Sequence, residues 1–332
     1  MVNSKKHSSF IKTFFPVPKY LSFDSMGIEL TPDCIRVFKL KKNPEGLMPE
    51  IYDEVMLDKV CNEIVEGNPQ DVCSDYLSAL ESLVKKHSMK YVVASLPEEK
   101  TYIYKTQIPI QAEGSIRDAV SFTIEENVPL DTSNITFDYY LISRTESFLN
   151  VVVFVISKDV LAGHTALLEK VGLVPISFES ESQALARSVI SKNDKETYLI
   201  LNLSPQSAHV AIAEHGIVHY ASSIPVDVSK IISDKEGREM ADFIGQLNKL
   251  LVFWFTNSNE GGNKKINTAI LSGVFSSEEG LAEYLTKHLK IDVQIANVWI
   301  NCFSFNDFIP PLSQKESSGY GVAIGLSLSS PL

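Results

Sequence analysis

Apolar and polar residues alternate along two stretches near the start of the chain, residues 22–30 and 34–40. A period of two is typical of a half-buried β-strand, because successive side chains point to opposite faces of the sheet. The segment Thr31-Pro32-Asp33 between the two stretches has the residue types of a tight turn. The pattern therefore predicts a β-hairpin close to the N-terminus.

The rest of the chain shows both strand-like and helix-like periods. Further strands are predicted at 51–57, 91–96, 102–108, 136–143, 148–156, 176–178, 197–203, 207–213, 217–224, 268–272 and 293–295. Helices are predicted from Asn68-Pro69 onward and at 112–126, 158–171, 182–190, 236–254, 280–288 and 319–329. This mixture predicts an α/β protein with hairpin sheets and covering helices in two similar halves.

Particular residues punctuate this pattern. Gly172 follows the helix predicted at 158–171, where a left-handed C-cap favours glycine. Ser180 and Gln183 have the spacing of a capping box and predict the start of the helix at 182–190. The polar run at 192–196 marks the main domain boundary, and 332 residues suit about two domains.

Composition and charge exclude several classes of protein. The chain is 44% hydrophobic and 21% charged, with a net charge of −11 and a pI near 5.2. An acidic chain without a basic patch in its body is a poor nucleic-acid binder. No apolar run reaches the roughly 18 residues of a membrane helix, and the start lacks the apolar core of a signal peptide. These features predict a soluble, cytoplasmic protein with no nucleic-acid partner.

The cysteines give no sign of a metal site at this stage. Cys34, Cys61, Cys73 and Cys302 form no Cys-x-x-Cys pair and have no metal-ligand spacing. They are expected to be reduced thiols, mostly buried.

Residues 1–20 form a separate basic and aromatic leader. They contain four lysines and three phenylalanines, and the first acidic residue is Asp24. Such a segment can rest on an anionic membrane surface, so residues 1–19 are a candidate for peripheral membrane contact. The alternative is a disordered leader that precedes a segment packed on the domain.

Three phrases of sequence, in this order, carry a resemblance to a known family. The first is Asp-Ala-Val-Ser-Phe-Thr-Ile-Glu-Glu-Asn-Val-Pro at 118–129, followed by Phe-Asp-Tyr-Tyr at 137–140. The second spans 173–187 and includes Glu181 and Arg187, and the third is Tyr-Gly-Val-Ala-Ile-Gly-Leu at 320–326. Together they resemble the PilM family of type IV pilus inner-membrane assembly proteins, which have an actin-like ATPase fold.

The resemblance implies an actin-like, ribonuclease H-like fold of two domains in the order found in FtsA. Domain 1 would comprise 21–96 and 158–191 with the C-terminal helix 319–329, and a small α/β subdomain would be inserted at 97–157. Domain 2 would comprise 192–318. About ten residues separate Pro225 from the next predicted helix, so the helical subdomain that covers the nucleotide in the family would be much reduced.

The nucleotide positions of the family are altered in this chain. Glu29 and Thr31 stand where the family has Asp and Gly. Asn202 and Ser204 stand where the family has the Asp and the Gly of an Asp-Ile-Gly motif. Only Gly273 remains of a run of glycines on the adenosine side. Glycines let backbone N–H groups approach phosphates, and acidic side chains hold Mg²⁺ through water. We therefore expect no enzyme activity and no cofactor, with vestigial ATP and magnesium binding left open.

The resemblance also implies a partner. Family members capture the cytoplasmic N-terminal peptide of PilN, a bitopic membrane protein, so this chain would be a non-catalytic adaptor at the inner face of the cell membrane. Other inner-membrane and motor proteins of the pilus machine would be further partners. The expected groove lies between domain 1 and the inserted subdomain, near Tyr102, Tyr104, Ile116 and Val120, where an extended peptide could pair with a sheet edge.

Three alternatives remain open. The first is a PilM-like protein that binds ATP and changes its partner contacts with the nucleotide state. The second is the L-type cytoplasmic domain of type II secretion, which the lack of a membrane helix in the 332 residues disfavours. The third is an FtsA-like filament former, for which the stretch after residue 326 is too short to supply an amphipathic membrane helix.

Other clusters of polar residues give weaker signals. His209 and His219 would lie on opposite faces of a hairpin that turns at His215, with residue 209 opposite 222, so a shared metal ion is not expected. Three acidic pairs could act as acid–base groups but are expected to face water. They are Glu98 with Glu99, Glu125 with Glu126, and Glu179 with Glu181.

Overall fold

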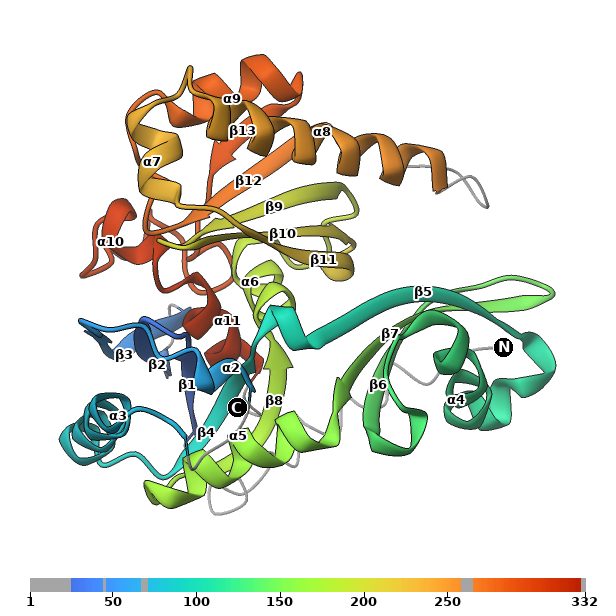
Figure 1. Cartoon of the computed structure of the whole chain (residues 1–332), viewed down its shortest axis with the longest axis horizontal. Helices are drawn as coiled ribbons and strands as arrows, with labels where there is room; N and C mark the ends of the chain where they lie inside the picture. Colours follow the sequence, from blue (N-terminus) through green and yellow to red (C-terminus); the bar gives the residue numbers. More distant parts are fainter. Residues whose placement is uncertain (1–24, 44–45, 67–70, 258–264, 330–332) are drawn as a thin grey trace.

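The computed structural model describes residues 25–43, 46–66, 71–257 and 265–329. The predicted leader at 1–20 and the helix start at Asn68-Pro69 lie outside these residues. Three sheets form the framework, two of five strands and one of three (Figure 1). Within the described residues, no helix is both long and apolar enough to cross a membrane.

The first sheet has the strand order β3-β2-β1-β4-β8. Its strands are β1 Ser25–Leu30, β2 Cys34–Asn43, β3 Gly46–Met56, β4 Tyr91–Leu96 and β8 Val174–Ser180. The first three are antiparallel, whereas β4 and β8 run parallel to β1. Helices α3 (Ser74–His87) and α5 (Lys158–Lys170) cover one face with a core that includes Tyr76, Leu80 and Leu167. The predicted hairpin is thus confirmed as part of this sheet.

The second sheet repeats this arrangement in the order β11-β10-β9-β12-β13. Its strands are β9 Thr197–Leu203, β10 Ser207–Glu214, β11 Ile217–Pro225, β12 Thr268–Gly273 and β13 Asp292–Ile295. Its outer face is covered by α7 (Val228–Ser233), α8 (Arg238–Asn257) and α9 (Leu281–Leu289). The same order of antiparallel and parallel pairs in both sheets confirms the prediction of two similar halves.

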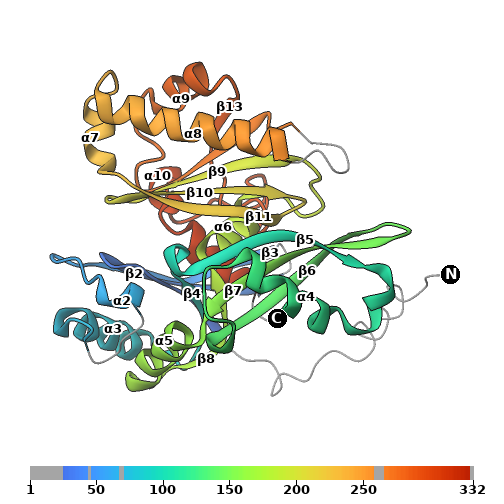
Figure 2. The same cartoon turned by 45° about the vertical axis from the view of Figure 1, so that its right-hand side comes forward.

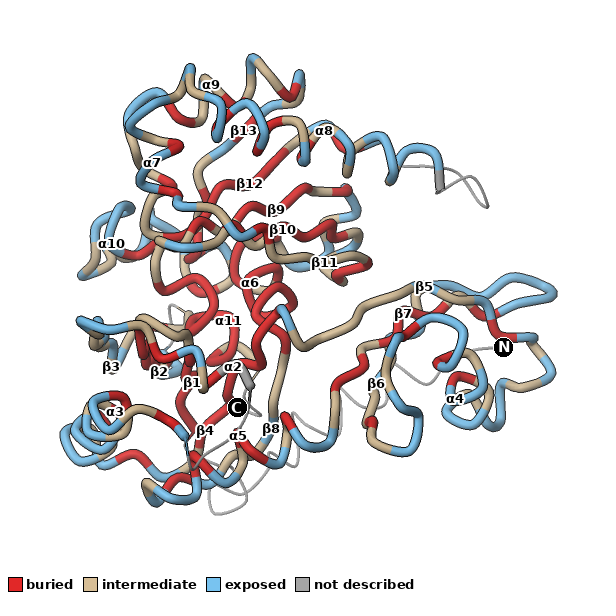
Figure 3. The backbone as a smooth tube through the Cα atoms, in the orientation of Figure 1, coloured by how far each residue is buried: buried red, intermediate tan, exposed pale blue. Residues whose placement is uncertain are grey.

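Two helices fill the space between the five-stranded sheets. They are α6 (Glu181–Val189) and α11 (Gly321–Ser329), and both are buried along almost their whole length (Figure 3). Their side chains join residues of both sheets in one core, for example Val93 of β4 and Ile200 of β9. Ser180 accepts a hydrogen bond from the Gln183 backbone N–H, which confirms the N-cap of α6. The second half of the predicted capping box does not form, because the Gln183 side chain bonds to Gly216 and Val218 instead.

The third sheet lies beside the first half and has the order β5-β7-β6 (Figures 1 and 2). Its strands are β5 Thr101–Pro109, β6 Ile135–Arg144 and β7 Phe148–Ser157, all antiparallel. Helix α4 (Ile116–Asn127) covers one face. The helix starts later than predicted because residues 110–115 form a 3-10 turn instead.

Short elements account for the other differences from the predicted pattern. Helices α2 (Glu63–Glu66), α7 and α10 (Gln314–Ser318) were not predicted, since four to six residues are too few to show a helical period. The β10–β11 hairpin contains a bulge between Ile212 and Ala213, and His209 therefore lies opposite Ser223 and not opposite residue 222. A bulge adds one residue to one strand and shifts the register beyond it.

Candidate functional site

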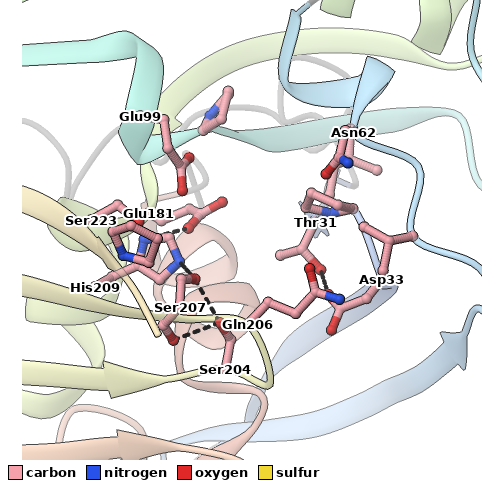
Figure 4. Close-up of a pocket in the computed structure, with 15 residues that line it drawn as sticks. Thr31, Asp33, Asn62, Glu99, Glu181, Ser204, Gln206, Ser207, His209 and Ser223 are labelled. Atoms are coloured by element: carbon pink, nitrogen blue, oxygen red, sulfur yellow. Dashed lines mark hydrogen bonds and ion pairs between the residues drawn. The ribbon is translucent and has the colours of Figure 1, made fainter. Parts of the chain in front are cut away.

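The turns of two hairpins, one from each half, face a shared cleft. Thr31 and Asp33 come from the β1–β2 turn, Ser204 and Gln206 come from the β9–β10 turn, and Ser207 begins β10. Together with α6 and the segment after β4 they line a cavity of about 410 Å³ (Figure 4). A volume of this size falls in the usual range of about 300–1,000 Å³ for small-molecule pockets.

A second, much smaller cavity of about 20 Å³ lies between the two hairpins. The five residues predicted at the altered nucleotide site all line it, so the structure brings them together: Glu29, Thr31, Asn202, Ser204 and Gly273. Such a volume holds about one water molecule. The space that these residues share is therefore nearly filled by the protein itself.

Arg36 also lines this small cavity. It lies opposite Glu29 in the β1–β2 pairing, and its guanidinium is 3.5 Å from the Glu29 carboxylate and 3.0 Å from that of Glu54. Both Glu29 and Arg36 are more than nine-tenths buried. Burial raises the pKa of the Glu29 carboxyl, and the ion pair with Arg36 opposes this shift. Sequence reasoning missed Arg36, because counting outward from the predicted turn at 31–33 pairs Glu29 with Ile35, one residue away from its observed partner.

The β1–β2 turn uses its own polar groups internally. The Thr31 hydroxyl donates to Asp33 Oδ1 at 2.9 Å and to the Cys34 carbonyl at 3.0 Å. The backbone N–H groups of Thr31 and Cys34 are also bonded within the turn, and Pro32 has none. Few backbone donors of this turn are left to bind a phosphate.

Gly273 has a structural reason to be glycine that is independent of any ligand. Its φ angle is +92°, in the region that favours glycine. A Cβ at this position would lie 2.6 Å from the Leu203 backbone nitrogen and 2.8 Å from Asn202 Oδ1. The close approach of β12 to the end of β9 therefore requires this glycine.

The larger cavity is lined by acidic groups with one histidine. Asp33, Glu99 and Glu181 contribute carboxyl groups, whereas His209 is the one basic side chain among the described residues that line it. Burial, followed by the nearby Glu99 and Glu29, raises the pKa of Glu181 well above its ordinary value. Burial has the opposite effect on His209, whose pKa it lowers, because the charged form of a histidine is the protonated one. The acidic groups along this wall would repel a negatively charged triphosphate unless a cation binds together with it.

Two of the acids expected to face water are buried instead. Glu181 starts α6 and reaches the cleft, and Glu98 is only 4% exposed. The Glu98 carboxylate accepts a hydrogen bond of 3.0 Å from the Ser182 N–H at the start of α6. Burial raises the pKa of Glu98 to about 7. Only the tertiary structure could show this, because Glu98 lies on a short turn far from α6 in sequence.

A chain of hydrogen bonds connects the β9–β10 turn to His209. Ser204 Oγ lies 2.8 Å from Ser207 Oγ, which lies 2.9 Å from His209 Nε2 (Figure 4). His209 Nδ1 is 3.8 Å from Glu181, beyond hydrogen-bond distance. The arrangement therefore lacks the acid-oriented base of a serine hydrolase. As predicted, His219 lies on the other face of the sheet from His209. Its ring centre is 6.0 Å from that of Trp254.

A groove between the inserted sheet and the first half is the second candidate site. It has a volume of about 410 Å³ and is lined mainly by β6, β7 and β8, with residues of α4, α5 and α6. Its apolar wall includes Tyr140, Phe154, Leu161 and Phe178. The rings of Tyr140 and Phe154 meet edge to face with centres 5.6 Å apart.

The residues predicted for the groove lie elsewhere. Val120 is fully buried between α4 and the inserted sheet, and Tyr102, Tyr104 and Ile116 pack against the same core. Tyr104 also forms a hydrogen bond of 2.9 Å with Thr123 of α4. These four residues therefore do not line this groove, and their part in binding a partner stays a prediction.

The two matching sheets and the facing hairpin turns define the class of this protein, which has the actin-like ATPase fold. No protein-family model and no curated protein matches the sequence. Among solved structures, a chain of a PilM–PilN type IV pilus biogenesis complex matches with a TM-score of 0.73 and 15% identity. The match covers 93% of this chain and 99% of that chain. The PilM-like fold inferred from the sequence is thereby confirmed.

Two further structures match less well. The cytoplasmic domain of an inner-membrane component of the Vibrio cholerae type II secretion system has a TM-score of 0.46 and 13% identity, covering 75% of this chain and 82% of that one. An actin-like ATPase-fold protein of unknown function from Bacteroides thetaiotaomicron has a TM-score of 0.45 and 16% identity, covering 86% of this chain and 99% of that one.

Proposed function

We propose that this protein is a non-catalytic, PilM-like adaptor of a pilus-type assembly machine. Its partner would be the extended cytoplasmic N-terminal peptide of a PilN-like membrane protein, which would place it at the inner face of the cell membrane. The peptide would bind in the groove between the inserted sheet and the first half. The overall similarity to PilM in a PilM–PilN complex supports this choice of partner.

The observation that carries the proposal is a pair of sheet edges at the groove. Strand β6 ends the inserted sheet and β8 ends the first five-stranded sheet, counting the strands of the described residues. Residues of both strands line the groove. An exposed edge offers backbone donors and acceptors to an extended peptide, and pockets between the side chains select its sequence.

The side chains of the groove indicate what the peptide should contain. Tyr140 is 41% exposed and, with Phe154 and Phe178, offers aromatic surface for apolar peptide residues. Arg117 and Asp138 supply opposite charges at the same wall, and the Arg117 guanidinium lies 4.5 Å from the centre of the Phe137 ring. A peptide with alternating apolar and charged residues fits this surface best.

The interior of the cleft supports a non-catalytic role. Arg36 pairs with Glu29 and lines the small cavity of about 20 Å³ that the five altered positions share. The β1–β2 turn bonds its own N–H groups, and Pro205 removes a donor from the opposite turn. Phosphate binding in this fold needs free backbone donors and space next to them.

The test is peptide binding by fluorescence anisotropy, with the N-terminal peptide of the PilN-like protein encoded by the same organism. Tyr140→Ala and Phe178→Ala should each weaken binding about tenfold, because buried aromatic anchors typically contribute more than about 1 kcal/mol. Phe253→Ala is the matched control, since Phe253 is 52% exposed on α8, away from the groove. Equal peptide affinities of all three variants and the parent protein would refute the groove as the peptide-binding site.

A nucleotide-controlled adaptor is the second candidate, favoured by the 410 Å³ cavity between the halves. Isothermal titration with Mg-ATP and Mg-ADP separates the two functions. If the protein is a non-catalytic adaptor, titration with nucleotide should give no heat of binding, whereas titration with the peptide should give a clear heat of binding. Micromolar nucleotide binding that changes peptide affinity would establish the switch instead.

A further inference from the structure

Three metal-ligating side chains gather beside the β1–β2 turn. Cys61, Glu63 and Cys73 each place one ligand atom within 4.8 Å of the other two. Eleven residues separate the two cysteines in the sequence, so the usual short spacings of metal motifs are absent. The packing of α2 and the start of α3 against the first sheet brings them together.

The geometry of the cluster fits a small tetrahedral site. Cys73 Sγ lies 3.4 Å from Glu63 Oε2. Zinc bonds of about 2.3 Å to sulfur and about 2.0 Å to oxygen, at a tetrahedral angle, place the two ligand atoms about 3.5 Å apart. The Cys73 backbone N–H donates to Cys61 Sγ at 3.1 Å, which orients that sulfur as an outer-shell hydrogen bond does in metal sites.

The exposure of the three residues leaves room for an ion and an outside ligand. Cys61 is fully buried, whereas Glu63 and Cys73 are partly exposed. The inner side of the site is thus protein and the outer side can receive water. The two other cysteines, Cys34 and Cys302, are both buried, and neither belongs to a cluster of this kind among the described residues.

We propose that Cys61, Glu63 and Cys73 bind one zinc ion, or a similarly thiophilic divalent cation, with water as the fourth ligand. Two thiolates and a carboxylate suit zinc, whose sites combine sulfur with nitrogen or oxygen ligands. A disulfide between the cysteines would leave the adjacent carboxylate without a role. Metal binding would release the thiol protons, so affinity should increase with pH.

The site is connected to the cleft between the halves. The Cys61 N–H donates to the Pro32 carbonyl at 2.8 Å, and the Leu57 N–H donates to the Asp33 carbonyl at 2.8 Å. Val60 and Asn62, on either side of Cys61, line the 410 Å³ cavity. An ion that fixes Cys61 would therefore hold one wall of this cavity and the β1–β2 turn in place.

The test uses tag-free, full-length protein that has been reduced and stripped of metal. Zn²⁺ titration against a chromophoric chelator should show one equivalent, and Co²⁺ should give a thiolate charge-transfer band. Cys61→Ser and Cys73→Ser should abolish that band. Glu63→Gln should weaken Zn²⁺ binding by at least about tenfold, the lower end of the effect of removing even an outer-shell partner. This milder change also guards against a cysteine variant that fails to fold.

Cys302→Ser is the matched control and should retain both the band and the affinity. Zn²⁺ affinity that stays unchanged in Glu63→Gln or in the Cys61→Ser/Cys73→Ser double variant would overturn the site as proposed. A Cys61–Cys73 crosslink that forms in air, in a protein without measurable Zn²⁺ affinity, would overturn it in favour of a redox pair. Hydrogen exchange at the Leu57 and Cys61 amides should slow when Zn²⁺ is added.

Discussion

At the scale of single residues, several polar side chains near the cleft form hydrogen bonds or ion pairs with other groups of the protein. Thr31 bonds within its turn, Arg36 pairs with Glu29 and Glu54, and Glu98 accepts from the start of α6. Each of these contacts gives a buried or half-buried polar side chain one partner, while Glu29 Oε2 and Glu98 Oε1 accept no hydrogen bond. Thr31 and Glu29, two of the predicted nucleotide positions, therefore bind groups of the protein itself.

The raised pKa of Glu98 predicts a pH dependence of stability. The folded state holds the proton up to about pH 7 and the unfolded state only to about 4.5. The contribution of Glu98 is therefore fully present below about pH 4.5 and is lost as the pH rises to 7. Glu98→Gln should remove this loss, which is on the order of 2 kcal/mol between pH 5 and 8. Urea unfolding of both proteins at the two pH values measures it, and identical pH slopes would contradict it.

At the scale of elements, the small residues of α11 decide how the molecule is assembled. A Cβ on Gly325 would lie 3.1 Å from the Ala184 Cα and closer still to its carbonyl group. A Cβ on Gly27 of β1 would collide with the backbone of α11. The last helix can therefore pack against α6 and β1 at backbone distance.

Gly325→Ala should destabilise the protein by about 2 kcal/mol, because overpacking a tight contact typically costs about 1–3 kcal/mol. Gly245→Ala on α8 is the control. Its Cβ meets nothing within 4 Å, so better helix propensity should stabilise by about 0.5–1 kcal/mol. Denaturant midpoints measure both, and equal shifts of the same sign would show that the contact does not matter.

At the scale of the whole molecule, Gln183 connects the two halves. From α6 its side chain donates to the Gly216 carbonyl at 3.0 Å and accepts from the Val218 N–H at 2.9 Å, both in the β10–β11 hairpin. The same residue lines the groove of the proposed peptide site. A peptide in the groove would thus contact a residue that fixes the orientation of the second half.

Gln183→Met should loosen this connection. The substitution keeps the size of the side chain but leaves two backbone groups unpaired, at a cost of about 1–3 kcal/mol. Hydrogen exchange at the Val218 amide should accelerate, together with a lower unfolding midpoint. Gln107→Met, at an exposed pair with Asn150, should change stability by less than about 0.5 kcal/mol. Equal changes in stability for the two substitutions would show that Gln183 has no special role in connecting the halves.

Long periodic elements were readable from sequence, and short or bulged ones were not. The α8 stripe of Met240, Phe243 and Leu247 is buried as its helical spacing predicted. Helix α7 and the bulge at Ile212 were missed, because neither has a repeating pattern. The five residues predicted at the nucleotide positions line one cavity, whereas the lining of the groove depends on which sheet face lies outward.

The sequence by itself determined the strands and the main helices, because these depend on local periodicity and residue type. The tertiary structure decided which polar groups meet. Glu98 meets Ser182 and Cys61 meets Cys73 only because elements distant in sequence pack together. Contacts of this kind leave no local pattern, since each partner is an ordinary residue in its own segment.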